Sequence, residues 1–92
     1  MIKNVTVIGA GLMGAGIAAH LTNAGTSVTL LDIPDDTSRN RNNLADQAVS
    51  KLTKVKPAAF TLPKNANLIK TGNIDDHLHL INQSEWVIEV II

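Results

Sequence analysis

Residues 5–32 read VTVIGAGLMGAGIAAHLTNAGTSVTLLD, and this stretch decides the fold. Residues 4–8 are mostly apolar or β-branched with no helical spacing, which is typical of a strand buried on both faces. Residues 12–24 then place apolar side chains at helical spacing, and Gly25 ends this predicted helix. A second apolar run at 27–31 predicts another strand. The alternation of strand, helix and strand predicts a βαβ unit with parallel strands.

The turn between the first strand and the helix carries three glycines at a defined spacing. It reads Gly9-Ala10-Gly11-Leu12-Met13-Gly14. This spacing suits a tight turn, a close approach of the backbone to a pyrophosphate, and close packing of the helix on the strand. The free N–H groups at the start of the helix would hold phosphates without a basic side chain. We therefore expect the turn to bind a dinucleotide.

Asp32 indicates which dinucleotide the glycine turn is expected to bind. It follows the second strand, where this fingerprint places a ribose-binding acid. A carboxylate accepts both hydroxyls of the adenosine ribose but repels the 2′-phosphate of NADP. Residues 33–36 contain no arginine that would hold such a phosphate, and the first arginines are Arg39 and Arg41. NAD is therefore the predicted cofactor, and FAD is the remaining alternative cofactor. A βαβ unit that binds no ligand is the alternative interpretation of the whole segment.

The sequence after the second strand predicts a loop, a helix and an irregular connection. Residues 34–38 gather a proline, two acids and two hydroxyls, the composition of a loop that caps a following helix. Residues 39–54 place apolar side chains on one face and predict an amphipathic helix packed on the sheet. Two prolines in 56–63 predict an irregular connection that still buries Phe60 and Leu62.

Two more strands are expected, at 67–71 and 86–92. Between them, Asn73 or Asp75 is expected to cap one or two helical turns over 76–82. In a doubly wound sheet the fourth strand returns beside the first, which gives the strand order 3-2-1-4. The predicted fold class is therefore α/β, a Rossmann-type doubly wound parallel sheet that is incomplete.

The chain is short, and its 92 residues are expected to form a single domain, 1–92. An apolar strand runs to the last residue with no polar tail, so we interpret the sequence as the N-terminal part of a larger domain. Eight acidic residues balance eight basic ones, which leaves no basic field for nucleic acid or an anionic membrane surface. Cysteine is absent, which fits a reducing compartment. We expect no nucleic-acid partner, no membrane partner and a cytoplasmic location.

Some side chains suggest a metal or catalytic site but are better explained otherwise. The candidates for a metal cluster are Asp75, Asp76, His77 and His79. Two histidines two residues apart on a helix point about 200° apart, so no metal site is expected. His20 lies in the middle of the first helix and is interpreted as a packed or half-exposed helix residue rather than a catalyst.

Other candidate residues lie toward the C-terminal half. Trp86 is expected to pack under the sheet edge rather than stack on adenine. Glu89 lies within an apolar strand, where a carboxylate needs a partner or the edge of a site, and its role stays open. Lys51, Lys54 and Lys56 lie near a predicted helix C-terminus and are interpreted as solvated side chains that complement the helix dipole.

Three segments together resemble the NAD-binding N-terminal domain of 3-hydroxyacyl-CoA dehydrogenases. They are VIGAGLMGAGIA at 7–18, LLD at 30–32 and WVIE at 86–89. The KPA at 56–58 and the TGN at 71–73 are similar to the long bacterial form that is fused to other β-oxidation activities.

The resemblance implies that the full-length protein oxidises (3S)-3-hydroxyacyl-CoA to 3-oxoacyl-CoA, with hydride transfer to NAD, in fatty acid β-oxidation. The implied cofactor contacts are Gly9, Ala10, Gly11, Leu12, Met13, Gly14, Asp32, Ile91 and Ile92. The family's catalytic histidine and glutamate and its dimer-forming helical domain lie outside these residues. We therefore expect no catalytic residue here, no activity from this segment alone, and a homo-oligomer for the full-length protein. Coenzyme A contacts are implied near Lys51 to Lys56.

Two other functions stay open from the sequence. One is a non-catalytic module that binds NAD, and the other is a different NAD-dependent hydroxyacid dehydrogenase. A histidine followed by a glutamate in the continuing sequence would favour the acyl-CoA enzyme.

Overall fold

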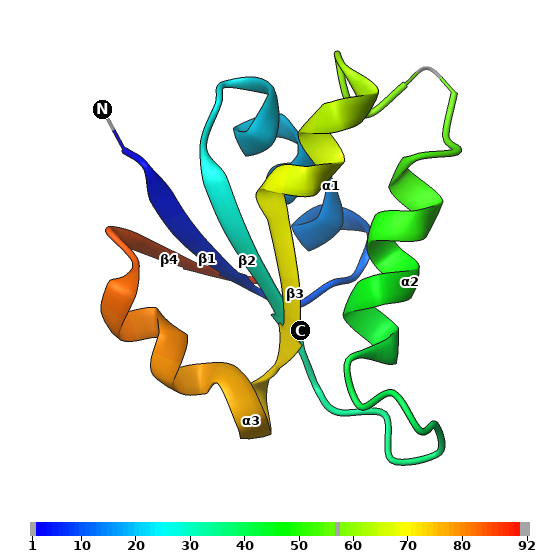
Figure 1. Cartoon of the computed structure of the whole chain (residues 1–92), viewed down its shortest axis with the longest axis vertical. Helices are drawn as coiled ribbons and strands as arrows, with labels where there is room; N and C mark the ends of the chain where they lie inside the picture. The colour runs from blue at the N-terminus through cyan, green and yellow to red at the C-terminus, as the bar shows by residue number, and fades with distance from the viewer. Residues whose placement is uncertain (1, 57, 91–92) are drawn as a thin grey trace.

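The computed structural model describes residues 2–56 and 58–90. Within them the chain alternates strands and helical segments (Figure 1). In order these are β1 (Asn4–Ile8), α1 (Leu12–Asn23), β2 (Ser27–Asp32), α2 (Asn43–Leu52), the 3-10 segment η1 (Pro63–Leu68), β3 (Ile69–Asn73), α3 (Ile74–His77), the 3-10 segment η2 (Leu78–Gln83) and β4 (Trp86–Glu89).

The four strands form one parallel sheet in the order β3-β2-β1-β4. β1 lies in the middle, where Val7 pairs with Leu30 of β2 on one side and Ile88 of β4 on the other. Since all four strands are parallel, their carboxyl ends meet at the same edge. The order 3-2-1-4 and the Rossmann-type fold predicted from the sequence are confirmed.

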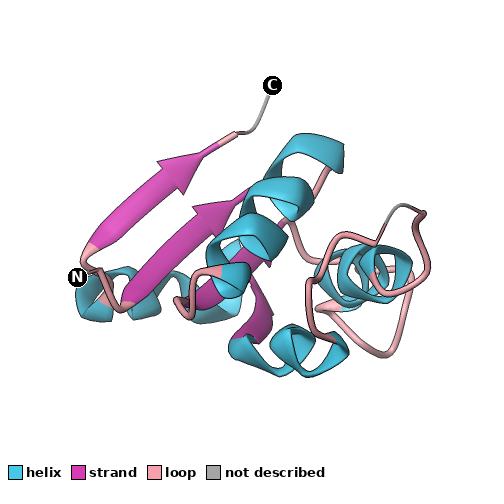
Figure 2. Cartoon of the chain, turned by 90° about the horizontal axis from the view of Figure 1, so that it is seen from above, coloured by secondary structure: helices cyan, strands magenta, loops and turns pink. Residues whose placement is uncertain are grey.

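One face of the sheet carries the main core. Val5, Val7 and Leu30 are at most 1% exposed and pack against Ala18 of α1, with α2 alongside. Ala15 and Ala19 are also buried on α1, and such small side chains let the helix lie close to its neighbours. Figures 1 and 2 show α1 on one side of the strands and the α3–η2 segment on the other.

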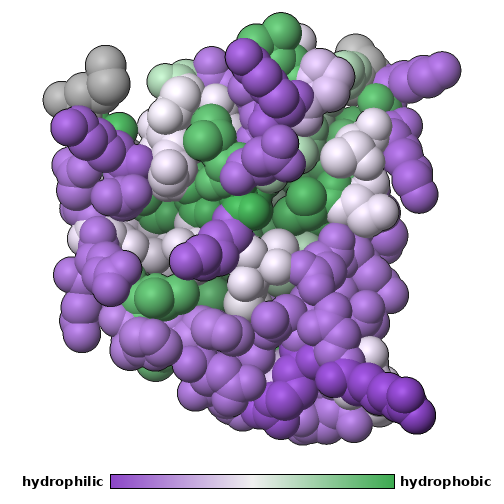
Figure 3. Space-filling view, viewed as in Figure 1, coloured by the Kyte–Doolittle hydropathy of each residue, from purple (hydrophilic) through white to green (hydrophobic). Residues whose placement is uncertain are grey.

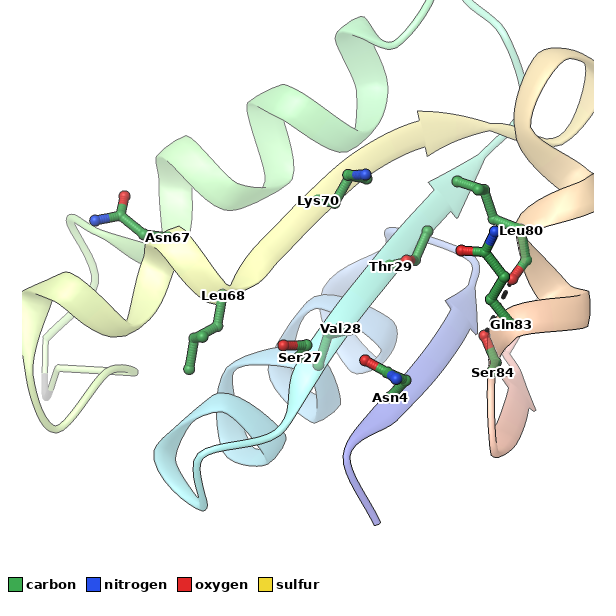
Figure 4. Close-up of a pocket in the computed structure, with 10 residues that line it drawn as sticks. All are labelled: Asn4, Ser27, Val28, Thr29, Asn67, Leu68, Lys70, Leu80, Gln83 and Ser84. Carbon is green, nitrogen blue, oxygen red and sulfur yellow. Dashed lines mark hydrogen bonds between the residues drawn. The ribbon is translucent and has the colours of Figure 1, made fainter.

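The second face of the sheet is only partly covered. η2 crosses it, and the hydroxyls of Thr6 and Ser84 are hydrogen-bonded beneath this segment. Beside η2 lies an open pocket of about 340 Å³ at the amino ends of the strands (Figure 4). Its lining includes Asn4, Ser27 and Lys70, so polar side chains occupy this part of the face.

Some expected boundaries and burials were wrong. β3 begins at Ile69 rather than two residues earlier, because η1 starts at Pro63 and continues to Leu68. Phe60 is buried at 5% exposed, as expected, but Leu62 is 51% exposed. Leu62 directly precedes η1, where the chain turns, and only one of the two apolar side chains reaches the core.

The helical boundaries also differ from the prediction. α2 begins at Asn43, and the side chain of its N-cap residue Asn42 makes no capping hydrogen bond. Asn73 caps α3, since its side chain accepts hydrogen bonds from the backbone N–H groups of Asp75 and Asp76. The helical region after β3 therefore begins at Ile74 and confirms Asn73 rather than Asp75 as the cap.

β4 is more exposed than the sequence predicted. Trp86 is 53% exposed and Val87 37%, so the expectation that Trp86 packs under the sheet edge was wrong. β4 pairs with β1 alone among the described strands, which leaves the strand exposed. The predicted strand residues Ile91 and Ile92 lie outside the described residues. None of the helices within 2–56 and 58–90 has the length and apolar character needed to cross a membrane.

Candidate functional site

The glycine turn connects the carboxyl end of β1 to α1. Gly9 has φ +111°, a conformation that favours glycine, and its N–H donates a 2.7 Å hydrogen bond to the carbonyl of Leu31 at the end of β2. A Cβ on Gly14 would lie 1.8 Å from the Gly9 carbonyl oxygen. Gly14 is therefore required for the close packing of α1 against the turn.

Gly11 has a different role from the other two glycines of the motif. A Cβ at this position would meet no atom within 4 Å, and its φ of −68° is open to any residue. No steric need of the folded chain therefore calls for glycine here. The open space lies where the first N–H groups of α1 emerge, and those groups have no partners within the helix.

Leu12 and Met13 begin α1 and face solvent. Leu12 is 95% exposed and Met13 is 70% exposed. There is no acidic side chain in the first turn of α1 and no side-chain hydrogen bond to its N-cap, Gly11. The positive end of the helix dipole is thus not neutralised by a capping carboxylate.

Asp32 is tied to the glycine turn. Its Oδ2 accepts a 2.9 Å hydrogen bond from the backbone N–H of Ala10, and its Oδ1 accepts a 2.7 Å bond from the N–H of Ile33. The two bonds orient the carboxylate at the carboxyl edge of the sheet. A carboxylate has about four acceptor sites, so both oxygens can still accept hydroxyl protons.

The end of β4 forms the other side of the turn. The N–H of Val90 donates a 2.9 Å hydrogen bond to the carbonyl of Ile8, and the Val90 side chain would lie 2.8 Å from a Cβ on Gly14. The predicted contacts Ile91 and Ile92 follow immediately in the chain but lie outside the described residues. Glu89 pairs with Ile8 and is exposed, so water solvates its carboxylate without a protein partner being required.

A pocket of about 330 Å³ opens beside the turn, between α1 and α2. On one side it is lined by Gly11, Leu12 and Asp32. On the other side the lining comes from α2 and the residues after it, and comprises Leu44, Gln47, Ala48, Lys51, Leu52 and Val55. Asp32 and Lys51 are the charged groups of this lining, which is otherwise mostly apolar.

The structure therefore brings together most of the predicted cofactor contacts at one edge of the sheet. A hydrogen bond joins Ala10 to the Asp32 carboxylate, another joins Gly9 to Leu31 at the end of β2, and Gly14 packs on Gly9. Lys51 and the lining residues after it lie in the range where coenzyme A contacts were implied. The lining residues before Lys51 on α2 were not predicted as part of a site. The apolar face of α2 was visible in the sequence, but only the tertiary packing shows that part of this face borders a pocket.

The other candidate side chains lie apart from this site. His20 is exposed in the last turn of α1. Within residues 2–56 and 58–90, no group of three histidine, aspartate or glutamate side chains is placed to hold a metal ion. The imidazole of His77 instead accepts a 3.0 Å hydrogen bond from the backbone N–H of Asn73 through Nδ1.

Comparison with known proteins identifies the family. A family model described as the NAD binding domain of 3-hydroxyacyl-CoA dehydrogenase matches residues 4–92. The chain belongs to this family. The resemblance inferred from the sequence is confirmed, and NAD is the cofactor that the family's description names.

Curated relatives carry matching names. A probable 3-hydroxyacyl-CoA dehydrogenase of Deinococcus radiodurans is 48% identical over 99% of this chain and 26% of its own length. A probable 3-hydroxyacyl-CoA dehydrogenase of Bacillus subtilis is 40% identical over 99% of this chain and 13% of its own length. The chain thus spans about a quarter or less of these two relatives.

Solved structures agree with the fold. A diketoreductase structure has a TM-score of 0.68 at 27% identity, with 98% of this chain and 32% of the other covered. The (S)-3-hydroxybutyryl-CoA dehydrogenase of Ralstonia eutropha has a TM-score of 0.62 at 26% identity, with 100% of this chain and 32% of the other covered.

Proposed function

We propose that this chain is the cofactor-binding part of an enzyme that oxidises the 3-hydroxyl of a 3-hydroxyacyl-CoA and transfers hydride to NAD. The observation that carries the proposal is the pairing of Asp32 with the glycine turn, beside an open Gly11. The names of the relatives supply the substrate class, because they are 3-hydroxyacyl-CoA dehydrogenases.

The residues present fit NAD. Space at Gly11 admits the pyrophosphate close to the backbone, and the N–H groups at the start of α1 supply donors without a lysine or arginine. The Asp32 carboxylate is already oriented by Ala10 and Ile33 to accept the hydroxyls of the adenosine ribose. Leu12, Met13, Ile91 and Ile92 remain proposed contacts around these two anchors.

NAD, when bound, accepts the hydride. The part played by these residues is to bind and orient the cofactor, and none of them is proposed to move a proton in the reaction. We propose that the base that takes the hydroxyl proton lies outside residues 1–92. Enzymatic activity is therefore expected of a longer chain that contains this base. We also propose that this enzyme is a homo-oligomer and that it is cytoplasmic.

The coenzyme A moiety is proposed to approach the pocket between α1 and α2. Lys51 lines this pocket, while Lys54 and Lys56 are not among its lining residues. An ammonium in the lining of a mostly apolar pocket suits a ligand with a phosphate and a long neutral arm. Lys51→Ala is expected to raise the KM for the acyl-CoA in the longer enzyme, and Lys54→Ala serves as the matched control.

Direct titration with NAD tests the cofactor proposal. Saturable binding of NAD is expected, and Asp32→Asn is expected to weaken it because a neutral amide accepts ribose hydroxyls less strongly than a carboxylate. Glu85→Gln is a matched control, since Glu85 precedes β4 at the opposite edge of the sheet and its carboxylate accepts a hydrogen bond from the N–H of Lys3. Failure of a folded wild-type chain to bind NAD would contradict the proposal.

A further inference from the structure

Arg41 is surrounded by carboxylates. Its Nη1 lies 2.8 Å from Asp36 Oδ1, its Nη2 3.4 Å from Asp75 Oδ2, and its Nε 3.0 Å from Asp76 Oδ2. Asp36 belongs to the loop between β2 and α2, whereas Asp75 and Asp76 lie on α3. We call these four side chains the Arg41 cluster; it joins two segments that are more than 30 residues apart in the chain.

The Arg41 cluster lies beside the ribose-binding acid. Asp32 pairs with Asn73 across β2 and β3, and the Nδ2 of Asn73 donates a 3.0 Å hydrogen bond to Asp76 Oδ2. One strand spacing, the Asn73 side chain and its hydrogen bond together place the Asp76 carboxylate about 10 Å from the backbone of Asp32. Figure 1 shows α3 and the loop before α2 at the lower edge of the view, and Figure 3 shows this edge covered by hydrophilic residues.

The Arg41 cluster carries net negative charge. One guanidinium faces three carboxylates, which leaves a formal charge of −2. Hydrogen bonds from Asn73 and Arg41 lower the pKa of Asp76, and the contact with Asp76 raises the pKa of Arg41. The carboxylate of Asp76 and the guanidinium of Arg41 are therefore both ionised at neutral pH.

Arg41 is one of the two arginines that follow Asp32, at Arg39 and Arg41. An arginine close to the ribose acid is the usual partner of a 2′-phosphate in NADP-binding sheets of this type. Here each nitrogen of Arg41 already faces a carboxylate. We infer that the Arg41 cluster selects NAD over NADP, because Asp36, Asp75 and Asp76 occupy this arginine and leave negative charge beside the ribose. This inference rests on the proposed cofactor site.

Neutralising the three carboxylates tests the inference. The variant carries Asp36→Asn, Asp75→Asn and Asp76→Asn, which keep the side-chain shapes and change the charge of the cluster from −2 to +1. NAD and NADP are each titrated into the wild type and the variant at low ionic strength. At about 10 Å with partial screening, the change should tighten NADP binding about fivefold. NAD has no 2′-phosphate, so its affinity should change by less than about twofold.

Two further variants test whether the charge of the Arg41 cluster causes the expected change in NADP affinity. Adding Arg41→Gln to the triple variant brings the charge of the cluster to 0 instead of +1, so the gain for NADP should fall from about fivefold to about threefold. Glu85→Gln, an acid neutralised at the opposite edge of the sheet, should leave the ratio of the two affinities unchanged. If circular dichroism shows that the triple variant does not fold, Asp36→Asn and Asp75→Asn are tested singly, with a shift in the ratio of about twofold expected for each.

The outcomes separate this inference from the proposed function. An unchanged NADP-to-NAD ratio in the folded triple variant, with normal NAD binding, would overturn the role of the Arg41 cluster and leave selectivity to Asp32 alone. A folded wild-type chain that binds neither cofactor would overturn the proposed function, and this inference with it.

Discussion

Replacing Gly11 with alanine should abolish tight NAD binding without unfolding the chain. A Cβ at Gly11 would meet no protein atom within 4 Å, and the backbone φ of −68° suits alanine. The methyl group would instead occupy the space proposed for the pyrophosphate. Loss of one or two hydrogen bonds from backbone N–H groups to a charged phosphate costs about 3 kcal/mol in total. The dissociation constant for NAD should therefore rise about 100-fold.

Gly16 provides a matched control for this experiment. It lies on α1 and is exposed, and an added Cβ would also meet no atom within 4 Å. Gly16→Ala should leave NAD affinity unchanged and stabilise the helix by about 0.5–1 kcal/mol. Gly11→Ala, at the N-cap, should cost about 1 kcal/mol of stability or less. Calorimetric titration gives the affinities and urea unfolding the stabilities; NAD binding by Gly11→Ala within threefold of the wild type would refute the reasoning.

Three further predictions concern stability. Gly14→Ala should lower the free energy of unfolding by about 3 kcal/mol, because its Cβ would lie 1.8 Å from the Gly9 carbonyl oxygen; a loss under about 0.5 kcal/mol in urea would contradict this packing. Asn73→Ala should cost about 1–2 kcal/mol through loss of the α3 cap, and an unchanged urea midpoint would exclude that role. Hydrogen bonds from Asn73 and Arg41 lower the pKa of Asp76 below its ordinary 3.8. The ionised Asp76 carboxylate therefore stabilises the folded chain above pH 3.8, and this stabilisation is lost as the pH falls through the lowered pKa. Thermal unfolding is measured at several pH values in this acid range. The melting temperature of Arg41→Gln should fall less with decreasing pH than that of the wild type, and equal falls in the two proteins would contradict a stabilising contact between Arg41 and Asp76.

The strands and the glycine turn were predictable because they depend on local sequence, and the strand order followed from the rule that the fourth strand of a doubly wound sheet returns beside the first. The strands around Val5 and Leu30 are runs of mostly apolar or β-branched residues, which is the pattern of buried parallel strands. The glycine spacing reflects steric needs within a few residues, and Gly9 and Gly14 meet in the structure as the motif requires. Asp32 follows from its position after the second strand.

The features that were missed depend on tertiary contacts. A proline can end one segment or begin another, and Pro63 begins η1, so β3 starts later than its apolar residues suggested. Trp86 is exposed because β4 has one strand neighbour among the described residues. The sequence of a strand does not show how many other strands will pair with it. Arg41 meets Asp75 and Asp76 across more than 30 residues, and no local pattern predicts that contact.

The most direct test of the central claim is to locate NAD on the chain. Amide proton–nitrogen correlation spectra recorded during an NAD titration report which backbone N–H groups change environment. The proposed cofactor site predicts the largest saturable shifts at Gly9, Ala10, Gly11 and Ile33, beside Asp32 and the start of α1. Shifts centred instead on the pocket at the amino ends of the strands, around Ser27, or no shifts at all in a folded chain, would contradict it.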